Sequence, residues 1–160
     1  MVMVEAVRIR EATEDDIQKV IEINLIALPE HYTLDFWLDH LRAWGKAFIV
    51  AEVDNKVVGY VMCRVESGLG FMRRKLTKLG HVVSIAVLPD YRRRGIGMMM
   101  MEECIKRLKE HYNVDEVYLE VRVSNVPAIN LYEKLGFKKV KIIKYYYLDG
   151  EDAFVMAKTL

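Results

Sequence analysis

The sequence feature that most constrains this chain is the stretch VSIAVLPDYRRRGIGMMMMEECIKRLKEH, residues 83–111. Its apolar first part predicts a buried strand, and the pattern over residues 96–111 predicts a helix. Between them lie three consecutive arginines and a Gly-Ile-Gly triplet. A further apolar strand at 115–123 would complete a strand-helix-strand unit with parallel strands, which belongs to a fold that mixes helices and sheet.

The turn between strand and helix has the composition of a phosphate-binding site. At the start of a helix several backbone N–H groups lack an intrahelical partner, and the helix dipole adds partial positive charge. Glycines let a ligand approach the backbone, and arginines add charge-assisted hydrogen bonds. We therefore predict that a phosphorylated ligand binds here. The residues of this turn are Arg92, Arg93, Arg94, Gly95, Ile96 and Gly97.

The turn does not match the common nucleotide motifs. A P-loop requires GxxxxGK[ST], and neither Gly-Lys-Ser nor Gly-Lys-Thr occurs in the chain. The dinucleotide fingerprint GxGxxG fails as well, because methionines follow Gly97. On these residues alone, a solvated basic turn whose glycines serve packing remains an alternative.

Composition excludes several classes of protein. The chain has 160 residues, 52% of them hydrophobic, and a formal net charge of +1. This predicts a single folded domain over 1–160 with no global signal for specific nucleic-acid or membrane binding. Cys63 and Cys104 form no CxxC motif, so we expect two buried, inert thiols in a cytoplasmic protein and no zinc or disulfide framework. The start of the chain turns acidic at once, unlike a signal peptide.

Periodicity and turn signals predict a mixed α/β domain whose first half is predominantly antiparallel. The expected elements are a strand at 7–10, a helix from the Thr13–Asp16 capping box to Pro29, a helix at 34–44 capped by Thr33, a hairpin about Asp54–Asn55, a mobile basic loop at 67–80, a strand at 81–88, a helix at 96–111, a strand at 115–123, a short helix ending at Gly136 and a terminal hairpin about Leu148-Asp149-Gly150.

Two motifs resemble the GNAT acetyltransferase superfamily. YRRRGIG is similar to its pyrophosphate loop, and SNVPAINLYEKLGF is similar to the downstream segment that completes its acetyl-CoA site. LPEHY, GHVVSIAV, YLEVRVSN and YYYLDGEDAF resemble the catalytic subunit of NatA-type N-terminal acetyltransferases, the archaeal-type form in particular, and less closely the bacterial ribosomal-protein acetyltransferases. The resemblance implies a mixed, mostly antiparallel sheet, flanked by about four helices, in which strands 81–88 and 115–123 splay apart.

The resemblance also implies how acetyl-CoA binds. The arginine turn would hold the pyrophosphate, and the pantetheine would pair with the backbone of Ile85, Ala86 and Val87. Asn125 would hold the pantetheine, and Tyr132 would lie near the thioester sulfur, where its phenol could protonate the leaving thiolate. A core aromatic on a short helix is the alternative for Tyr132.

The acceptor would be the α-amino group of a protein N-terminus. Its pKa of about 8 leaves roughly a quarter of it neutral near pH 7.4, against ~0.1% for a lysine, so one carboxylate or histidine acting through water is sufficient as a base. The candidates are Glu30 in LPEHY, His81 and Glu120. An exposed loop glutamate and a structural strand-end histidine are the alternatives for the first two, whereas a carboxylate in a buried strand is costly unless it is paired or functional. By resemblance, His81 and Glu120 lie close together; they could capture a stray metal ion, but we predict no required metal.

The resemblance implies a peptide site as well. Glu30 and Tyr32 would form one wall, and Tyr146 and Tyr147 would line the groove for the first substrate residues. Arg122 could balance Glu120 or orient Glu30. A structural ion pair for Arg122 and an aromatic cross-strand cluster for the tyrosines are the alternatives.

Three functions follow. The first is direct acetyl transfer from acetyl-CoA to protein N-termini in a ternary complex. The second is an acetyltransferase for lysine or a small amine, since fold does not fix function. The third is a subunit that docks on a ribosome or an auxiliary protein through the basic segment 67–80 and uses acetyl-CoA as a structural ligand.

Overall fold

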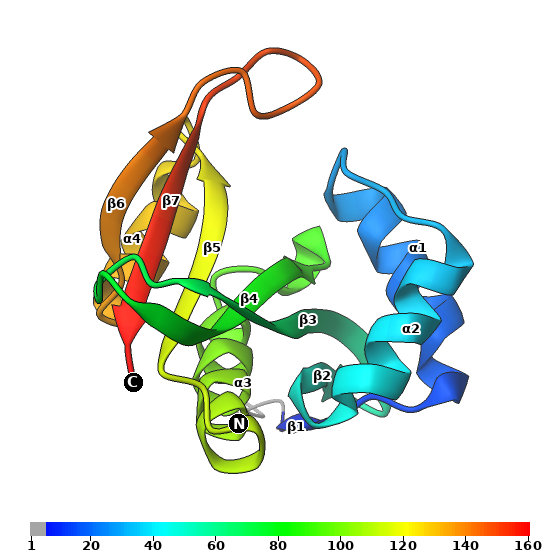
Figure 1. Cartoon of the computed structure of the whole chain (residues 1–160). Helices are drawn as coiled ribbons and strands as arrows, with labels where there is room; N and C mark the ends of the chain where they lie inside the picture. Colours follow the sequence, from blue (N-terminus) through cyan, green and yellow to red (C-terminus); the bar gives the residue numbers. More distant parts are fainter. Residues whose placement is uncertain (1–5) are drawn as a thin grey trace. The chain divides into compact units, whose positions relative to one another are not determined.

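The structure is a computed structural model that describes residues 6–160 (Figure 1). The α-helices are α1 (Ile17–Ala27), α2 (Leu34–Trp44), α3 (Ile96–Tyr112) and α4 (Val126–Lys134), and the strands are β1 (Val7–Glu11), β2 (Phe48–Val53), β3 (Lys56–Leu69), β4 (Leu76–Val87), β5 (Glu116–Arg122), β6 (Lys138–Ile143) and β7 (Ala153–Thr159). The order of helices and strands is the one predicted from the sequence. Within the described residues, no helix is long and apolar enough to cross a membrane.

The strands pair in the order β1-β2-β3-β4-β5-β7-β6. The β1–β2, β2–β3, β5–β7 and β6–β7 pairs are antiparallel. β4 and β5 are parallel, with Leu79–His81 opposite Glu116–Tyr118. The mixed, mostly antiparallel sheet is therefore confirmed, and the separation of β4 from β5 beyond this register stays a prediction.

The chain divides into two compact units. Unit 1 comprises Met1–Arg64 and Val83–His111, and unit 2 comprises Val65–Val82 and Tyr112–Leu160. β3 and β4 contribute to both. The prediction of one domain over residues 1–160 stays a prediction.

The core of unit 1 follows from the alternation of side chains along β3. Tyr60 and Met62 are buried with apolar residues of α1 and with Trp37 of α2. Gly59 has the opposite parity, and a Cβ built on it would lie 3.1 Å from Cε of Met100 in α3. One face of β3 therefore packs against α1 and α2, and the other packs against α3.

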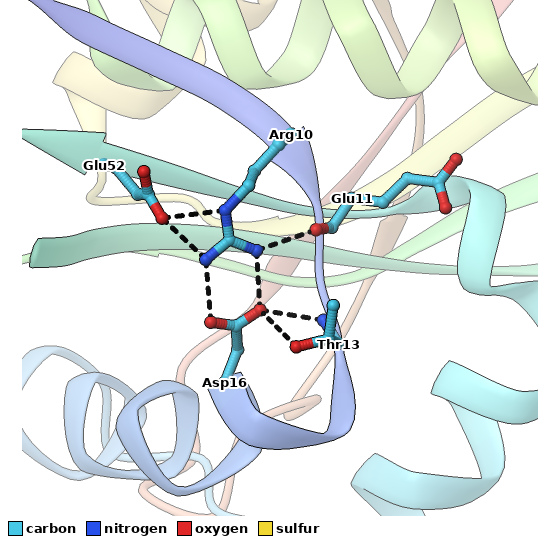
Figure 2. Close-up of polar contacts among 5 residues, drawn as sticks. All are labelled: Arg10, Glu11, Thr13, Asp16 and Glu52. Carbon is cyan, nitrogen blue, oxygen red and sulfur yellow. Dashed lines mark hydrogen bonds and ion pairs between the residues drawn. The ribbon is translucent and has the colours of Figure 1, made fainter. Parts of the chain in front are cut away.

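The start of α1 is held by a charged cluster that the sequence analysis did not predict (Figure 2). The guanidinium of Arg10 donates to both carboxylate oxygens of Asp16, at 2.7 and 2.9 Å, and its Nε donates to Glu52 at 2.8 Å. Asp16 also accepts a hydrogen bond from the backbone N–H of Thr13, so the predicted capping box is present, although a short 3₁₀ turn precedes α1. The hydrogen bonds from Arg10 hold the pKa of Asp16 below its ordinary value, against the effect of burial.

The other helix ends and the hairpin turn of unit 1 are those expected from the local sequence. Leu28 is extended, as expected before Pro29, and ends α1. The Thr33 side chain accepts from the backbone N–H of Phe36 and caps α2. Asp54 and Asn55 both have positive φ, at 51° and 64°, as a two-residue hairpin turn requires.

The prediction of a mobile loop at 67–80 is wrong. β3 continues to Leu69 and β4 begins at Leu76, so most of this segment is strand. The buried carboxylate of Glu116 accepts hydrogen bonds from the backbone N–H groups of Phe71, Met72 and Arg73, at 2.9 to 3.0 Å. The glycines of this segment suggested a loop. Glu116 lies in a strand far along the chain, so its hydrogen bonds to this segment could not be predicted from the local sequence.

A glycine is required where this connection turns. A Cβ built on Gly70 would lie 2.4 Å from the carbonyl oxygen of Arg73 and 2.5 Å from Oε2 of Glu116. The close approach of Glu116 to the backbone therefore depends on the absence of a side chain at residue 70.

Candidate active site

The arginine turn lies in unit 1, between the end of β4 and the start of α3. Arg93 and Gly95 adopt positive φ, at 63° and 79°, and α3 begins at Ile96. The Nε of Arg92 donates to the carbonyl oxygen of Val87 at 3.1 Å, and a guanidinium nitrogen of Arg94 donates to that of Asp90 at 3.0 Å. Two arginines are thus tied to the backbone that leads into the turn.

The turn is open to solvent. The side chains of residues 92–94 are exposed, and a Cβ built on Gly95 would meet no atom within 4 Å. Ile96 is buried and anchors the first turn of the helix. An exposed helix N-terminus with cationic side chains beside it can bind an anionic group.

The strand that leads into this turn is closely packed. Ala86 is buried, while Ile85 and Val87 are half-buried. A Cβ built on Gly59 of β3 would lie 3.1 Å from the carbonyl oxygen of Ala86, so the glycine permits this close approach of β3 to β4.

Asn125 and Tyr132 lie in unit 2, on α4. Asn125 is the N-cap of this helix, and its side-chain oxygen accepts from the backbone N–H of Ala128 at 3.3 Å. Its amide nitrogen is the part of the side chain that can donate to a ligand. Tyr132 is buried and packs against Phe137 with 5.9 Å between ring centroids, so it has the core contacts of the alternative interpretation.

His81 in β4 has a carboxylate at each ring nitrogen. Nε2 lies 2.7 Å from Oε2 of Glu120 in β5, and Nδ1 lies 3.1 Å from Oε2 of Glu66 in β3. The predicted proximity of His81 and Glu120 is therefore confirmed within unit 2. Tyr118 stacks on the imidazole with 4.3 Å between centroids, and its hydroxyl donates to Glu66.

This arrangement favours the imidazolium form of His81. Burial alone would lower the pKa of His81, but the hydrogen bond to Glu120 and the charges of Glu120 and Glu66 outweigh it and raise the pKa above its ordinary value. A neutral imidazole has only one N–H, so it can donate to only one of these carboxylates. The imidazolium, with two N–H groups, can donate to both carboxylates at once.

Glu30 and Tyr32 lie in unit 1, in the connection between α1 and α2. The backbone carbonyl of Glu30 accepts from the side-chain amide of Asn24 at 3.0 Å. Asn24 is buried and also donates to the hydroxyl of Tyr60 at 3.1 Å, and that hydroxyl lies 2.6 Å from Oγ of Ser84. The position of the Glu30 backbone is therefore fixed by a buried polar chain that reaches β3 and β4.

Aromatic packing supports the same connection. Tyr32 stacks on Phe36 with 4.5 Å between centroids and meets Trp37 edge-on at 5.5 Å. Trp37 in turn meets Tyr60 edge-on at 5.4 Å. Burial raises the pKa of Tyr60 to about 12, so its phenol stays protonated at neutral pH.

Arg122 organises the β6–β7 connection in unit 2. It donates to Asp149 at 2.8 Å and to Glu151 at 3.0 Å, and its guanidinium lies 4.0 Å from the ring centroid of Tyr147. Tyr146 meets Tyr147 edge-on at 4.9 Å. The ion pair that the sequence left open for Arg122 is thus present, and the tyrosines follow β6 in the connection instead of lying on the strand.

Four polar residues that support the predicted ones were not predicted from the sequence. Glu66 and Tyr118 complete the surroundings of His81, and Asn24 and Tyr60 support the connection that carries Glu30. Tyr118 and Glu120 share one face of β5 by their spacing. That spacing was the available signal, whereas nothing local marks Asn24 or Tyr60.

Comparisons with known proteins agree with the motifs. The model of the Acetyltransferase (GNAT) family matches residues 13–137. An N-alpha-acetyltransferase from Sulfurisphaera tokodaii is 56% identical over 155 residues, which cover 96% of this chain and 93% of that protein. The N-terminal acetyltransferase A complex catalytic subunit NAA10 of Arabidopsis thaliana is 38% identical, over 95% of this chain and 77% of that protein.

A solved structure shares the fold. One chain of the NatC complex bound to Gag peptide and CoA superposes with a TM-score of 0.86 at 27% sequence identity, over 96% of this chain and 98% of that chain. Because the family model spans most of the chain and the relatives cover nearly all of it, the resemblance noted in the sequence is confirmed. This chain belongs to the acetyltransferase (GNAT) family.

Proposed function

We propose that this protein transfers the acetyl group of acetyl-CoA to the free α-amino group of protein N-termini. The observation that carries the proposal is the His81–Glu120 pair, a proton acceptor held in place by Glu66 and Tyr118. N-terminal acetyltransferases at 56% and 38% identity support the choice of acceptor. An acetyl transfer to an amine requires such a base, because only the neutral amine attacks a thioester.

The cosubstrate is assigned to the arginine turn and its neighbours. The turn is exposed, presents the N-terminus of α3 and has open space at Gly95, so it fits a pyrophosphate. The backbone of residues 85–87 would pair with the pantetheine, and the amide nitrogen of Asn125 would donate to it. When bound, acetyl-CoA supplies an activated acyl carbonyl.

Removal of a proton from the substrate's α-ammonium group is assigned to the His81–Glu120 pair. With His81 neutral, a proton from the α-ammonium group would pass through one water to the carboxylate of Glu120 and from Glu120 to Nε2, and the charge of Glu120 stabilises the imidazolium that forms. The neutral amine then forms its bond to the acyl carbon as the bond to sulfur breaks, and the second proton of the nitrogen, which the amide does not keep, would leave to water. Tyr132 would return a proton to the leaving thiolate. No metal is expected to be required.

Glu30, Tyr32, Tyr146 and Tyr147 are assigned to the peptide. The carboxylate of Glu30 would anchor the incoming ammonium group or act as a second base, and the tyrosine hydroxyls would hydrogen-bond to the first peptide units. Arg122 is a positioning residue in this proposal, because its contacts with Asp149, Glu151 and Tyr147 fix the connection that carries both tyrosines.

We further propose a cytoplasmic protein that acts beside the ribosome. The exposed side chains of Arg74, Lys75 and Lys78 at the β3–β4 end, beside the half-buried Arg73, support contact with an acidic surface such as ribosomal RNA. Sedimentation of the purified chain with ribosomes at rising salt tests this. Binding that is lost when Arg73 and Arg74 are replaced by glutamine supports it.

The acceptor is tested with two matched peptides and acetyl-CoA, analysed by mass spectrometry. One begins with free serine and has its lysines blocked, and the other has a blocked N-terminus and one free lysine. Acetylation of the first peptide alone is the expected result. Acetylation of the second alone would assign the chain to lysine acetylation and overturn the proposed role of Glu30 and the tyrosines.

A further inference from the structure

The two cysteines of the chain, 41 positions apart in sequence, come together inside unit 1. Cys63 lies in β3 and Cys104 lies in α3. Cys63 shares the parity of Gly59, whose missing side chain would meet Met100 of α3, and Cys104 is one helical turn beyond Met100. Strand and helix therefore direct both thiols into the same interface.

Both thiols are held inside this interface. Sγ of Cys104 donates to the carbonyl oxygen of Met101 at 3.3 Å, and the neighbouring Cys104 raises the pKa of the Cys63 thiol. Both side chains are fully buried, at 0% exposure.

We propose that Cys63 and Cys104 are an oxidation site that forms an intramolecular disulfide between β3 and α3. The oxidant is a low-molecular-weight disulfide such as oxidised glutathione. The thiolate of one cysteine attacks it, forms a mixed disulfide and releases one glutathione thiolate. The thiolate of the other cysteine then attacks the protein sulfur and releases the second glutathione. The two protein thiols lose their protons, the protein is oxidised by two electrons, and the small disulfide is reduced to two thiols.

The folded chain resists this reaction until the interface opens. The neighbouring Cys104, together with burial, raises the pKa of the Cys63 thiol, and the thiol form is a poor nucleophile. A small disulfide also cannot reach a side chain that is fully buried. The disulfide is therefore made during folding or local opening, and once made it is shielded from reductants by the same burial.

The disulfide would enclose the elements that bind the proposed cosubstrate. The segment between Cys63 and Cys104 contains β4 and the arginine turn. Closing a loop of this length in the unfolded chain is expected to raise Tm by roughly 10 °C for a chain of this size. Because both cysteines lie in the same interface, a local shift of the two side chains is expected to bring the sulfurs to bonding distance.

The test uses the wild-type chain, reduced and unfolded in guanidinium chloride, then refolded with a mixture of oxidised and reduced glutathione. We expect the refolded monomer to have no titratable thiol in denaturant, a mass lower by two hydrogen atoms and a Tm above that of the reduced chain. Because the chain has two cysteines, a monomer with this mass has the 63–104 disulfide. Native chain given the same mixture at low temperature should keep both thiols.

Cys63→Ala and Cys104→Ala are matched controls, and their Tm should not depend on the glutathione mixture. A refolded wild-type monomer that keeps two thiols, or that forms the disulfide without a rise in Tm, would overturn the proposal. The readouts are mass, thiol content and Tm, so the result is independent of the acetyl acceptor. If a control variant fails to fold, the comparison of the reduced and the oxidised wild-type chain still tests the proposal.

Discussion

The two units place a cation between two carboxylates in the same way, yet with different consequences. In unit 1, Arg10 lies between Asp16 and Glu52 (Figure 2). In unit 2, His81 lies between Glu120 and Glu66. A guanidinium keeps its charge at every physiological pH, whereas an imidazole gains and loses a proton near neutrality. The first cluster can therefore only hold structure, and the second can also move a proton.

The comparison predicts different outcomes when each cation is removed. Replacing His81 by alanine should reduce kcat for an N-terminal peptide by about 100-fold, the effect typical of losing a general base. Tm should fall as well, because Glu120 and Glu66 lose the imidazole between them, so kcat is expressed per folded molecule. Steady-state kinetics with saturating acetyl-CoA measure kcat, and a thermal melt measures Tm. A kcat within a factor of two of wild type would assign the base to another residue.

Arg10→Met should reduce stability alone. It leaves Asp16 and Glu52 without their cation, and breaking a buried ion pair costs about 3–5 kcal/mol of unfolding free energy. We expect a value near the low end, about 3 kcal/mol, because the Arg10 side chain is 23% exposed. Activity per folded molecule should not change. Urea unfolding at pH 7 measures the loss.

Arg8→Met is the matched control for Arg10→Met. Arg8 is an exposed residue of the same strand, and the change should alter the unfolding free energy by no more than about 0.5 kcal/mol. Equal losses for the two variants would show that the cluster in Figure 2 contributes nothing beyond the ordinary value of an arginine on β1.

The two clusters also show what a sequence can and cannot predict. The elements follow local rules of spacing and capping, and their order was predicted correctly. The partners of Arg10 are 6 and 42 positions away, and Glu66 is 15 positions from His81. Such pairs depend on the register of a sheet, which local patterns do not fix. The loop predicted at 67–80 failed for the same reason, because Glu116 acts from a distant strand.

Some residues of the candidate site could be predicted from the sequence, and others could not. The arginine turn follows from helix electrostatics and glycine geometry, so its residues are visible in one short stretch. The pairing of His81 with Glu120 came from the family resemblance, and the structure confirms it. Asn24 and Tyr60 could not be predicted, because the local sequence around a buried asparagine in an amphipathic helix does not show which residue it contacts.

A smaller effect is expected for Glu66→Gln, which should change the pH dependence of activity. The charge of Glu66 helps to raise the pKa of His81, so its removal should lower that pKa. Activity needs neutral His81, and the acid side of the kcat–pH profile should therefore move to lower pH. The same peptide is used for both enzymes, so the pKa of its α-amine is common to both profiles. An unchanged or upward-shifted profile would contradict the proposed role of His81.

The smallest expected effects are changes of the unfolding free energy with pH. The stabilisation by one cluster is lost as pH rises, and the stabilisation by the other is lost as pH falls. The pKa of His81 is raised in the folded chain, so its stabilisation is fully present below the unfolded value of about 6.5 and is lost as pH rises through the folded pKa. The pKa of Asp16 is lowered, so its stabilisation is present above about 3.9 and is lost as pH falls through the folded pKa. Unfolding free energies from pH 3 to 9 for wild type, His81→Gln and Asp16→Asn separate the two. The difference between wild type and His81→Gln should shrink toward alkaline pH, and that between wild type and Asp16→Asn should shrink toward acid pH. If both differences shrink in the same direction, the two clusters do not differ in the way their cations imply.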